Sequence, residues 1–124
     1  MVINQSVEDY LEAVLIITKK NNSCRSIDIA NLLSFSKASV SVAISKLGNE
    51  GYLVKHENGQ IELTPSGLEI AEKIYERHSF FSNLFIDLGI DEETSFHDAC
   101  EIEHTVSNET FLKLKEYFDQ HPIK

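Results

Sequence analysis

Apolar residues recur every three or four positions along most of the chain, which is the pattern of amphipathic α-helices. In the first half this spacing predicts helices over residues 6–20, 27–33 and 37–50. Between residues 52 and 64 the pattern changes to alternation, with Asn58-Gly59 in the middle. Alternating strands around Asn-Gly predict a two-stranded β-hairpin.

Capping residues support these boundaries. Ser6 and Ser26 are expected to cap the first two helices, and Gly51 suits the left-handed position after the third. A helix, a short turn, a second helix and then a hairpin follow the order of a winged helix-turn-helix.

Helical spacing returns in the second half. Proline at the first helical position begins a long helix expected over 65–88, and two shorter helices are expected over 93–106 and 108–119. The predicted fold is therefore mainly α with a small β-hairpin.

Length and composition narrow the class of protein. A chain of 124 residues that is 42% apolar can form one compact unit, or two small subdomains with a shared core. No apolar run approaches the roughly 20 residues of a membrane span, and the start at Met1 does not resemble a signal peptide. We therefore expect no membrane contact. Two distant cysteines, Cys24 and Cys100, favour reduced thiols, so a cytoplasmic protein is expected. Cys24 has no role that the sequence defines.

Charge divides unevenly between the halves. The net charge is -9, of which residues 1–64 carry -1 and residues 65–124 carry -8. The second half therefore favours cations, and the first half is no strong electrostatic DNA binder by itself.

The third helix has a polar outer face that suits the major groove of DNA. Small hydroxyls, two lysines and one outward valine form this face: Ser36, Lys37, Ser39, Ser41, Val42, Ser45 and Lys46. On the hairpin, Lys55 and His56 are expected to contact phosphates. A solvated surface helix is the alternative, but the hairpin and both helix boundaries favour DNA binding.

The segment from His97 to His104 carries candidate metal ligands. Cys100, Glu103 and His104 share one face of the expected helix and offer sulfur, oxygen and nitrogen. Such donors suit Fe(II), Mn(II), Co(II) or Zn(II). His97 and Glu101 lie on the same flank, as minor ligands or outer partners of the ligands.

Further candidates lie elsewhere. Asp9 and Glu12 are three residues apart on the first helix, and His78 is on the long helix. Taken singly, each has an ordinary structural explanation, such as a helix-cap partner, a surface carboxylate or a locally bonded histidine. Together with the thiol of Cys100 and the carboxylate of Glu103, these residues favour a metal site.

Several segments together resemble the diphtheria toxin repressor family of iron- and manganese-responsive transcriptional regulators. The matching runs are residues 6–12, 26–30, 39–41, 63–67, 77–78 and 100–104. The resemblance covers residues 6 to about 118 and implies a winged helix-turn-helix DNA-binding domain over 1–64. It implies a helical metal-binding and dimerisation domain over 65–124, a homodimer and a double-stranded operator. The chain resembles the short two-domain form of the family, for which no SH3-like domain is expected.

The resemblance also assigns ligands position by position. Asp9, Cys100, Glu103 and His104 correspond to the family's main metal site, whereas Glu12 and His78 correspond to its second site. Iron-responsive members have methionine in place of Asp9, and manganese-responsive members have glutamate in place of Cys100. The iron branch's ancillary histidine falls at Phe96, one residue before His97. Because the thiolate is soft, Fe(II) is favoured over Mn(II), with one or two ions per protomer.

The predicted function is a metal-dependent repressor with Fe(II) or Mn(II) as co-repressor, controlling metal-homeostasis genes. The alternative is a metal-independent winged-helix regulator that senses a small organic ligand. A metalloenzyme is disfavoured, because the chain offers no evident general base apart from the ligands.

Overall fold

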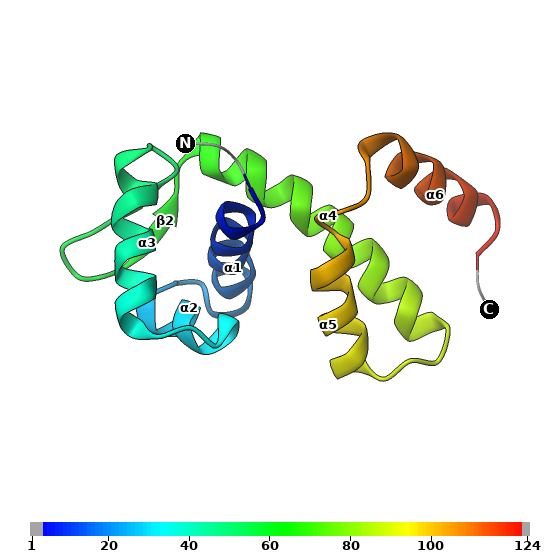
Figure 1. Ribbon diagram of the computed structural model, residues 1–124, viewed down its shortest axis with the longest axis horizontal. Helices are drawn as coiled ribbons and strands as arrows, with labels where there is room; N and C mark the ends of the chain where they lie inside the picture. The colour runs from blue at the N-terminus through cyan, green and yellow to red at the C-terminus, as the bar shows by residue number, and fades with distance from the viewer. Residues whose placement is uncertain (1–3, 123–124) are drawn as a thin grey trace. The chain divides into compact units, whose positions relative to one another are not determined.

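The computed structural model describes residues 4–122. Met1, on which the expectation about a signal peptide rests, lies outside the described residues. The elements are α1 (Gln5–Asn21), α2 (Ser26–Leu33), α3 (Lys37–Asn49), β1 (Leu53–Lys55), β2 (Ile61–Leu63), α4 (Pro65–Asp87), α5 (Glu92–Ile102) and α6 (Asn108–Gln120) (Figure 1). The predicted fold class, mainly α with one small antiparallel hairpin, is confirmed. The chain divides into two compact units, residues 1–73 and 74–124, so the division falls within α4. The functional boundary expected after residue 64 stays a prediction.

The first unit has a helical core closed by the hairpin. α1 packs against α2 and β2, α2 packs against α3, and α3 packs against β1. Its largest fully buried apolar side chains are Leu11, Val14, Ile29, Val40 and Ile61. The apolar face of α3 is thus turned inward, which leaves its polar face exposed.

Helix caps differ in part from the expected ones. Asn4, not Ser6, caps α1, because its side chain accepts the Val7 N–H at 3.1 Å. Ser26 is the first residue of α2 rather than its cap, and the Arg25 N–H donates to the Asp28 carboxylate at 3.0 Å. Gly51 has φ 84°, as predicted for the residue after α3.

The hairpin is shorter than predicted and has a longer loop. Leu53 pairs with Leu63 and Lys55 with Ile61, so each strand has three residues. The His56 N–H donates to the Gln60 carbonyl at 2.8 Å, which leaves residues 57–59 as the loop. Gly59 has φ 89° and supplies the left-handed residue that a three-residue loop needs.

The start of α4 is fixed to the segment that precedes β1. The Thr64 hydroxyl donates to the Gly51 carbonyl at 2.6 Å and accepts the Gly67 N–H at 3.3 Å. Any Cβ at Gly67 would overlap the carbonyl oxygen of Tyr52. Glycine is therefore required there for close backbone approach.

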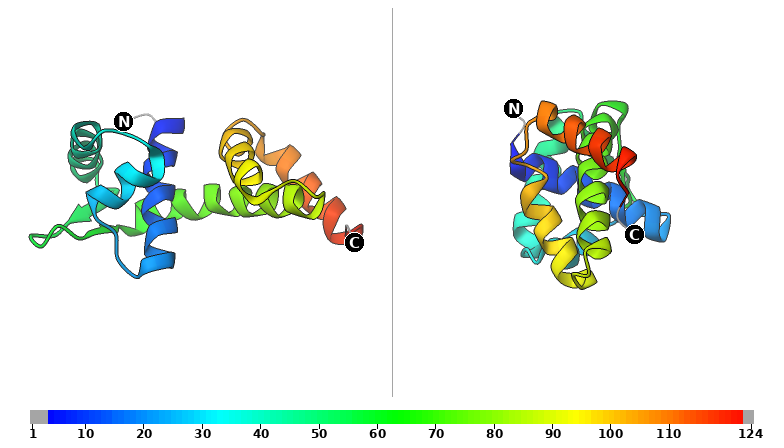
Figure 2. Two further views of the ribbon diagram at one scale, coloured as in Figure 1. Left: turned by 90° about the horizontal axis from the view of Figure 1, so that it is seen from below. Right: turned by 90° about the vertical axis from the view of Figure 1, so that its right-hand side faces the viewer.

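The second unit is built from the C-terminal part of α4 with α5 and α6. α5 turns back beside α4, and α6 follows after a short turn (Figures 1 and 2). Phe81, Ala99 and Phe111 form its buried core. The rings of Phe80 and Phe111 meet edge to face with centroids 5.5 Å apart.

No single helix among residues 4–122 is long and apolar enough to cross a membrane. By length and composition alone, α2 and α3 pass that test as a pair, with a bend of 118° between them.

Candidate metal centre

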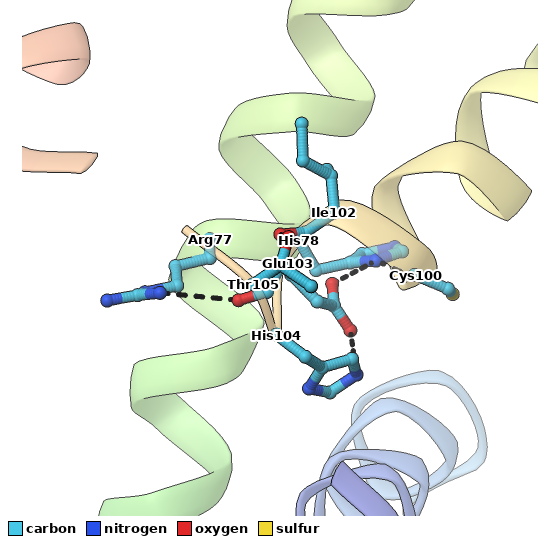
Figure 3. A network of polar contacts seen from close by, with 7 residues as sticks. All are labelled: Arg77, His78, Cys100, Ile102, Glu103, His104 and Thr105. Atoms are coloured by element: carbon cyan, nitrogen blue, oxygen red, sulfur yellow. Dashed lines mark hydrogen bonds and ion pairs between the residues drawn. The ribbon is translucent and has the colours of Figure 1, made fainter. Parts of the chain in front are cut away.

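Three potential ligands meet in the second unit. His78 comes from α4, Cys100 from α5 and Glu103 from the residue after α5 (Figure 3). His78 Nδ1 lies 2.9 Å from Glu103 Oε2 and 3.9 Å from Cys100 Sγ. One ligand atom from each residue lies within 4.8 Å of the other two.

Packing holds the His78 ring in place. Its side chain is buried, and the Phe96 ring meets it nearly at right angles with centroids 4.7 Å apart. Tyr75 also stacks on this imidazole, with the ring centroids 6.4 Å apart. Phe96, the position to which the resemblance assigned an ancillary histidine, thus holds an aromatic ring that contacts a candidate ligand.

Glu103 is fully buried although it is a carboxylate. It keeps helical backbone angles, and its N–H donates to the Ala99 carbonyl at 3.1 Å. Cys100 and Glu103 therefore keep the one-turn relation that the sequence predicted. A buried carboxylate needs compensating partners, and imidazoles or a cation supply them.

The predicted extent of the helix to residue 106 is wrong, since α5 ends at Ile102. The N–H and hydroxyl of Thr105 both donate to the Ile102 carbonyl, at 3.1 and 3.0 Å, which closes a turn in place of the helix. His104 lies in this turn, with Nε2 3.4 Å from Glu103 Oε1. The imidazole therefore reaches the buried carboxylate from a turn, and helical spacing does not place it there.

Arg77 fixes this turn from the neighbouring helix. Its guanidinium donates to the carbonyls of Glu103, at 3.3 Å, and of Val106, and it lies 5.3 Å above the Phe111 ring. It acts as a positioning residue for Glu103. In the sequence only its place beside His78 in a matching pair hinted at this role.

The donor set fits a divalent transition metal. Ligands bound at 2.0–2.3 Å lie about 3–4 Å from one another, close to the separations found here. Imidazole nitrogen, thiolate sulfur and carboxylate oxygen together suit ions from Mn(II) to Zn(II). A metal-free His78–Glu103 ion pair is the simpler alternative, but it leaves the nearby thiol without a function.

Four other predicted ligands are not part of this cluster: two are on α1 in the first unit, and two are on the exposed surface of α5. Asp9 and Glu12 lie three residues apart on α1, and Glu12 is buried. His97 and Glu101 are exposed on α5, and His97 Nδ1 lies 3.7 Å from Asp98 Oδ1. Neither His97 nor Glu101 contributes to the cluster of described residues.

The predicted DNA-contacting face of α3 is exposed along its length. Ser36 caps the helix by accepting the Ser39 N–H at 3.1 Å, so this hydroxyl also has a structural role. Val42 is 68% exposed, which is unusual for valine and suits an apolar base contact. On the hairpin Lys55 is exposed, and His56 Nε2 lies 3.5 Å from Glu62 Oε2.

Comparison with known families assigns both halves of the chain. Residues 3–60 match the N-terminal DNA binding domain of iron dependent repressors, and residues 64–122 match their metal binding and dimerisation domain. The chain belongs to the iron-dependent repressor family. It is thus a metal-dependent DNA-binding transcriptional repressor with a divalent metal as cofactor, and not an enzyme.

Two relatives of this iron-dependent repressor are HTH-type transcriptional regulators. An uncharacterised HTH-type transcriptional regulator of Methanocaldococcus jannaschii is 33% identical over 120 residues, 95% of this chain and 96% of that one. The HTH-type transcriptional regulator MntR of Geobacillus thermodenitrificans is 34% identical over 102 residues, 82% of this chain and 72% of the relative.

Among solved structures, IdeR of T. acidophilum is similar with a TM-score of 0.80 and 27% identity. The match covers 96% of this chain and 55% of IdeR, so the chain spans about half the length of that protein.

Proposed function

We propose that this iron-dependent repressor uses Fe(II) or Mn(II) as co-repressor and controls genes of metal homeostasis. It acts in the cytoplasm as a homodimer on double-stranded operator DNA. Residues 1–64 bind DNA, and residues 65–124 bind metal and dimerise. The observation that carries the proposal is the meeting of His78, Cys100 and Glu103 in the unit that matches the family's metal-binding domain.

The full ligand set in this proposal is Asp9, Glu12, His78, Cys100, Glu103 and His104, holding one or two ions per protomer. A bound dication supplies positive charge that offsets the carboxylates of Asp9, Glu12 and Glu103. His78 offers an imidazole nitrogen from a buried side chain, and Cys100 offers a soft sulfur from a partly exposed one. The ion must favour the DNA-competent conformation, because equal binding to both conformations changes no equilibrium.

The thiol of Cys100 decides the order of metal preference. Thiolate favours Fe(II) over Mn(II), whereas the two carboxylates on α1 favour harder ions. Fe(II) is therefore the first choice and Mn(II) the second.

DNA contacts follow from the exposed face of α3 and from the hairpin. The hydroxyls, lysines and Val42 of α3 meet base edges and phosphates in the major groove. Lys55 and His56 meet phosphates beside it. The phosphate contacts orient the protein on the duplex, and the base contacts give sequence specificity.

Anaerobic calorimetric titration with Mn(II), Fe(II), Co(II) and Zn(II) tests the metal site. We expect Glu103→Gln to lower affinity by more than the roughly 10- to 100-fold that loss of an outer partner costs. Glu116→Gln, the same change on an exposed carboxylate of α6, is the matched control. Cys100→Glu should move the preference toward Mn(II), and Asp9→Met toward Fe(II). Unchanged heats in Glu103→Gln and Cys100→Ala would instead favour a metal-independent regulator that senses an organic ligand.

A further inference from the structure

The loop of the hairpin is held by few bonds of its own. The Gly59 N–H donates to the His56 carbonyl at 2.9 Å, and Asn58 Oδ1 accepts the Gln60 N–H at 2.9 Å. An isolated hairpin with three residues in each strand is at best marginally stable in water. The orientation of the loop therefore depends on what it contacts outside the hairpin.

The segment between α1 and α2 makes those outside contacts. The Cys24 carbonyl accepts the Ile61 N–H at 2.8 Å, and the Arg25 guanidinium donates to the Asn58 carbonyl. Cys24 is fully buried, which anchors this segment in the core of the first unit. The Arg25 backbone is tied in turn to the Asp28 carboxylate at the start of α2.

Gly59 leaves space for the guanidinium. A Cβ at this position would lie 2.8 Å from Arg25 Nη1, in addition to the strain of φ 89°. The arginine thus lies directly against the loop. Because α2 packs on α3, the Arg25–Asn58 bond links the hairpin loop to the helix pair that carries the DNA-contacting face.

We infer that Arg25 is a positioning residue for DNA binding, which holds the hairpin loop in a fixed orientation relative to α3. This inference rests on the proposed DNA contacts of α3 and the hairpin. With Arg25 in place, both elements can meet one duplex without first ordering the loop. Without it, ordering the loop costs free energy at the moment of binding.

The test compares Arg25→Ala, Arg25→Lys and the wild type on one DNA duplex, in the presence of Mn(II). The duplex is obtained by in vitro selection from random-sequence DNA with the wild-type protein. Lys20→Ala, which removes one exposed cation at the end of α1, is the matched control for charge. Thermal unfolding of each variant, followed by circular dichroism, reports any loss of stability.

We expect Arg25→Ala to weaken binding by about three- to tenfold, which corresponds to ordering one or two side chains. Hydroxyl-radical footprints should lose protection at the backbone sugars beside the hairpin and keep it at those beside α3. Arg25→Lys should restore part of both, because lysine can donate one bond to the carbonyl, whereas Lys20→Ala should leave the footprint unchanged.

Two results would overturn the inference. A uniform loss of protection would mean that Arg25 only stabilises the fold. Intact protection at the hairpin with a smaller salt dependence than the control would mean that Arg25 itself contacts a phosphate. Failure of the metal-loaded wild type to select any duplex is a different outcome, which would contradict the proposed function itself.

Discussion

The two thiols of this protein have unlike surroundings. Burial, and secondarily the charge of Asp28, raise the pKa of Cys24 to about 12. Its side chain also has no exposed surface. Cys100 is partly exposed and lies beside His78 in the candidate metal centre. One cysteine is thus a core residue, and the other is placed to act as a ligand.

Thiol labelling can distinguish these roles. At pH 8 the Cys24 thiol remains protonated and shielded, so iodoacetamide should label Cys100 alone in the folded protein. Mn(II) at ten times its dissociation constant should slow this labelling about tenfold, because only metal-free protein reacts. Mass spectrometry of the labelled peptides gives the site and the rate, with Cys24→Ser as control. Labelling that ignores the metal, or that reaches Cys24 before unfolding, would contradict these assignments.

Residue types predicted part of the site, but not its arrangement. The spacing of Cys100 and Glu103 was sufficient to place them together, because Glu103 keeps a helical backbone. His104 approaches Glu103 from a turn that is held by hydrogen bonds from Arg77 and Thr105. The local sequence pattern does not predict these bonds. The pairing of His78 with Glu103 joins residues 25 positions apart, and only tertiary packing brings them together.

The helix α5 carries Cys100, and its N-terminus is stabilised by a capping residue, Asp91. Asp91 accepts the Thr94 N–H at 3.0 Å, and this bond lowers the pKa of the Asp91 carboxyl below its usual value. A lowered pKa in the folded state means that the charged carboxylate stabilises the helix. The charge also interacts favourably with the positive end of the helix.

This cap predicts a pH dependence of stability. Its contribution should be complete above the unfolded pKa, near 3.9, and should disappear as the pH falls through the lower folded value. Asp91→Asn keeps an oxygen acceptor and removes the charge, so it should be less stable than the wild type at pH 7 and equal to it near pH 2. Urea unfolding of the metal-free proteins across this range measures the difference. A constant difference at all pH values would argue against the carboxylate's role.

The helices were more predictable than their ends and the hairpin. Periodicity located all six described helices, and Pro65 and Gly51 marked boundaries correctly. Asn4 caps α1 in place of the predicted Ser6, because the Asn4 side chain accepts the Val7 N–H. The hairpin loop has three residues because His56 and Gln60 share one further bond, which turn propensity does not reveal.

For the whole molecule, charge limits how DNA can be bound. Residues 1–64 carry -1 and residues 65–124 carry -8, so long-range attraction to phosphate is weak. The proposed mode of binding therefore relies on well-oriented contacts from α3 and the hairpin rather than on long-range electrostatic attraction. We therefore expect the affinity for DNA to depend less steeply on salt than that of more basic repressors.

In the proposed function, metal held by the His78–Cys100–Glu103 cluster and its proposed partners switches DNA binding. Anaerobic fluorescence anisotropy on the selected duplex, with Fe(II) or Mn(II) and then with chelator, tests it most directly. We predict that metal tightens binding by about 5- to 150-fold, the range of typical couplings, that chelator reverses the change, and that Glu103→Gln removes it. Equal affinity of the wild type for this duplex with metal and with chelator would show that metal does not switch DNA binding.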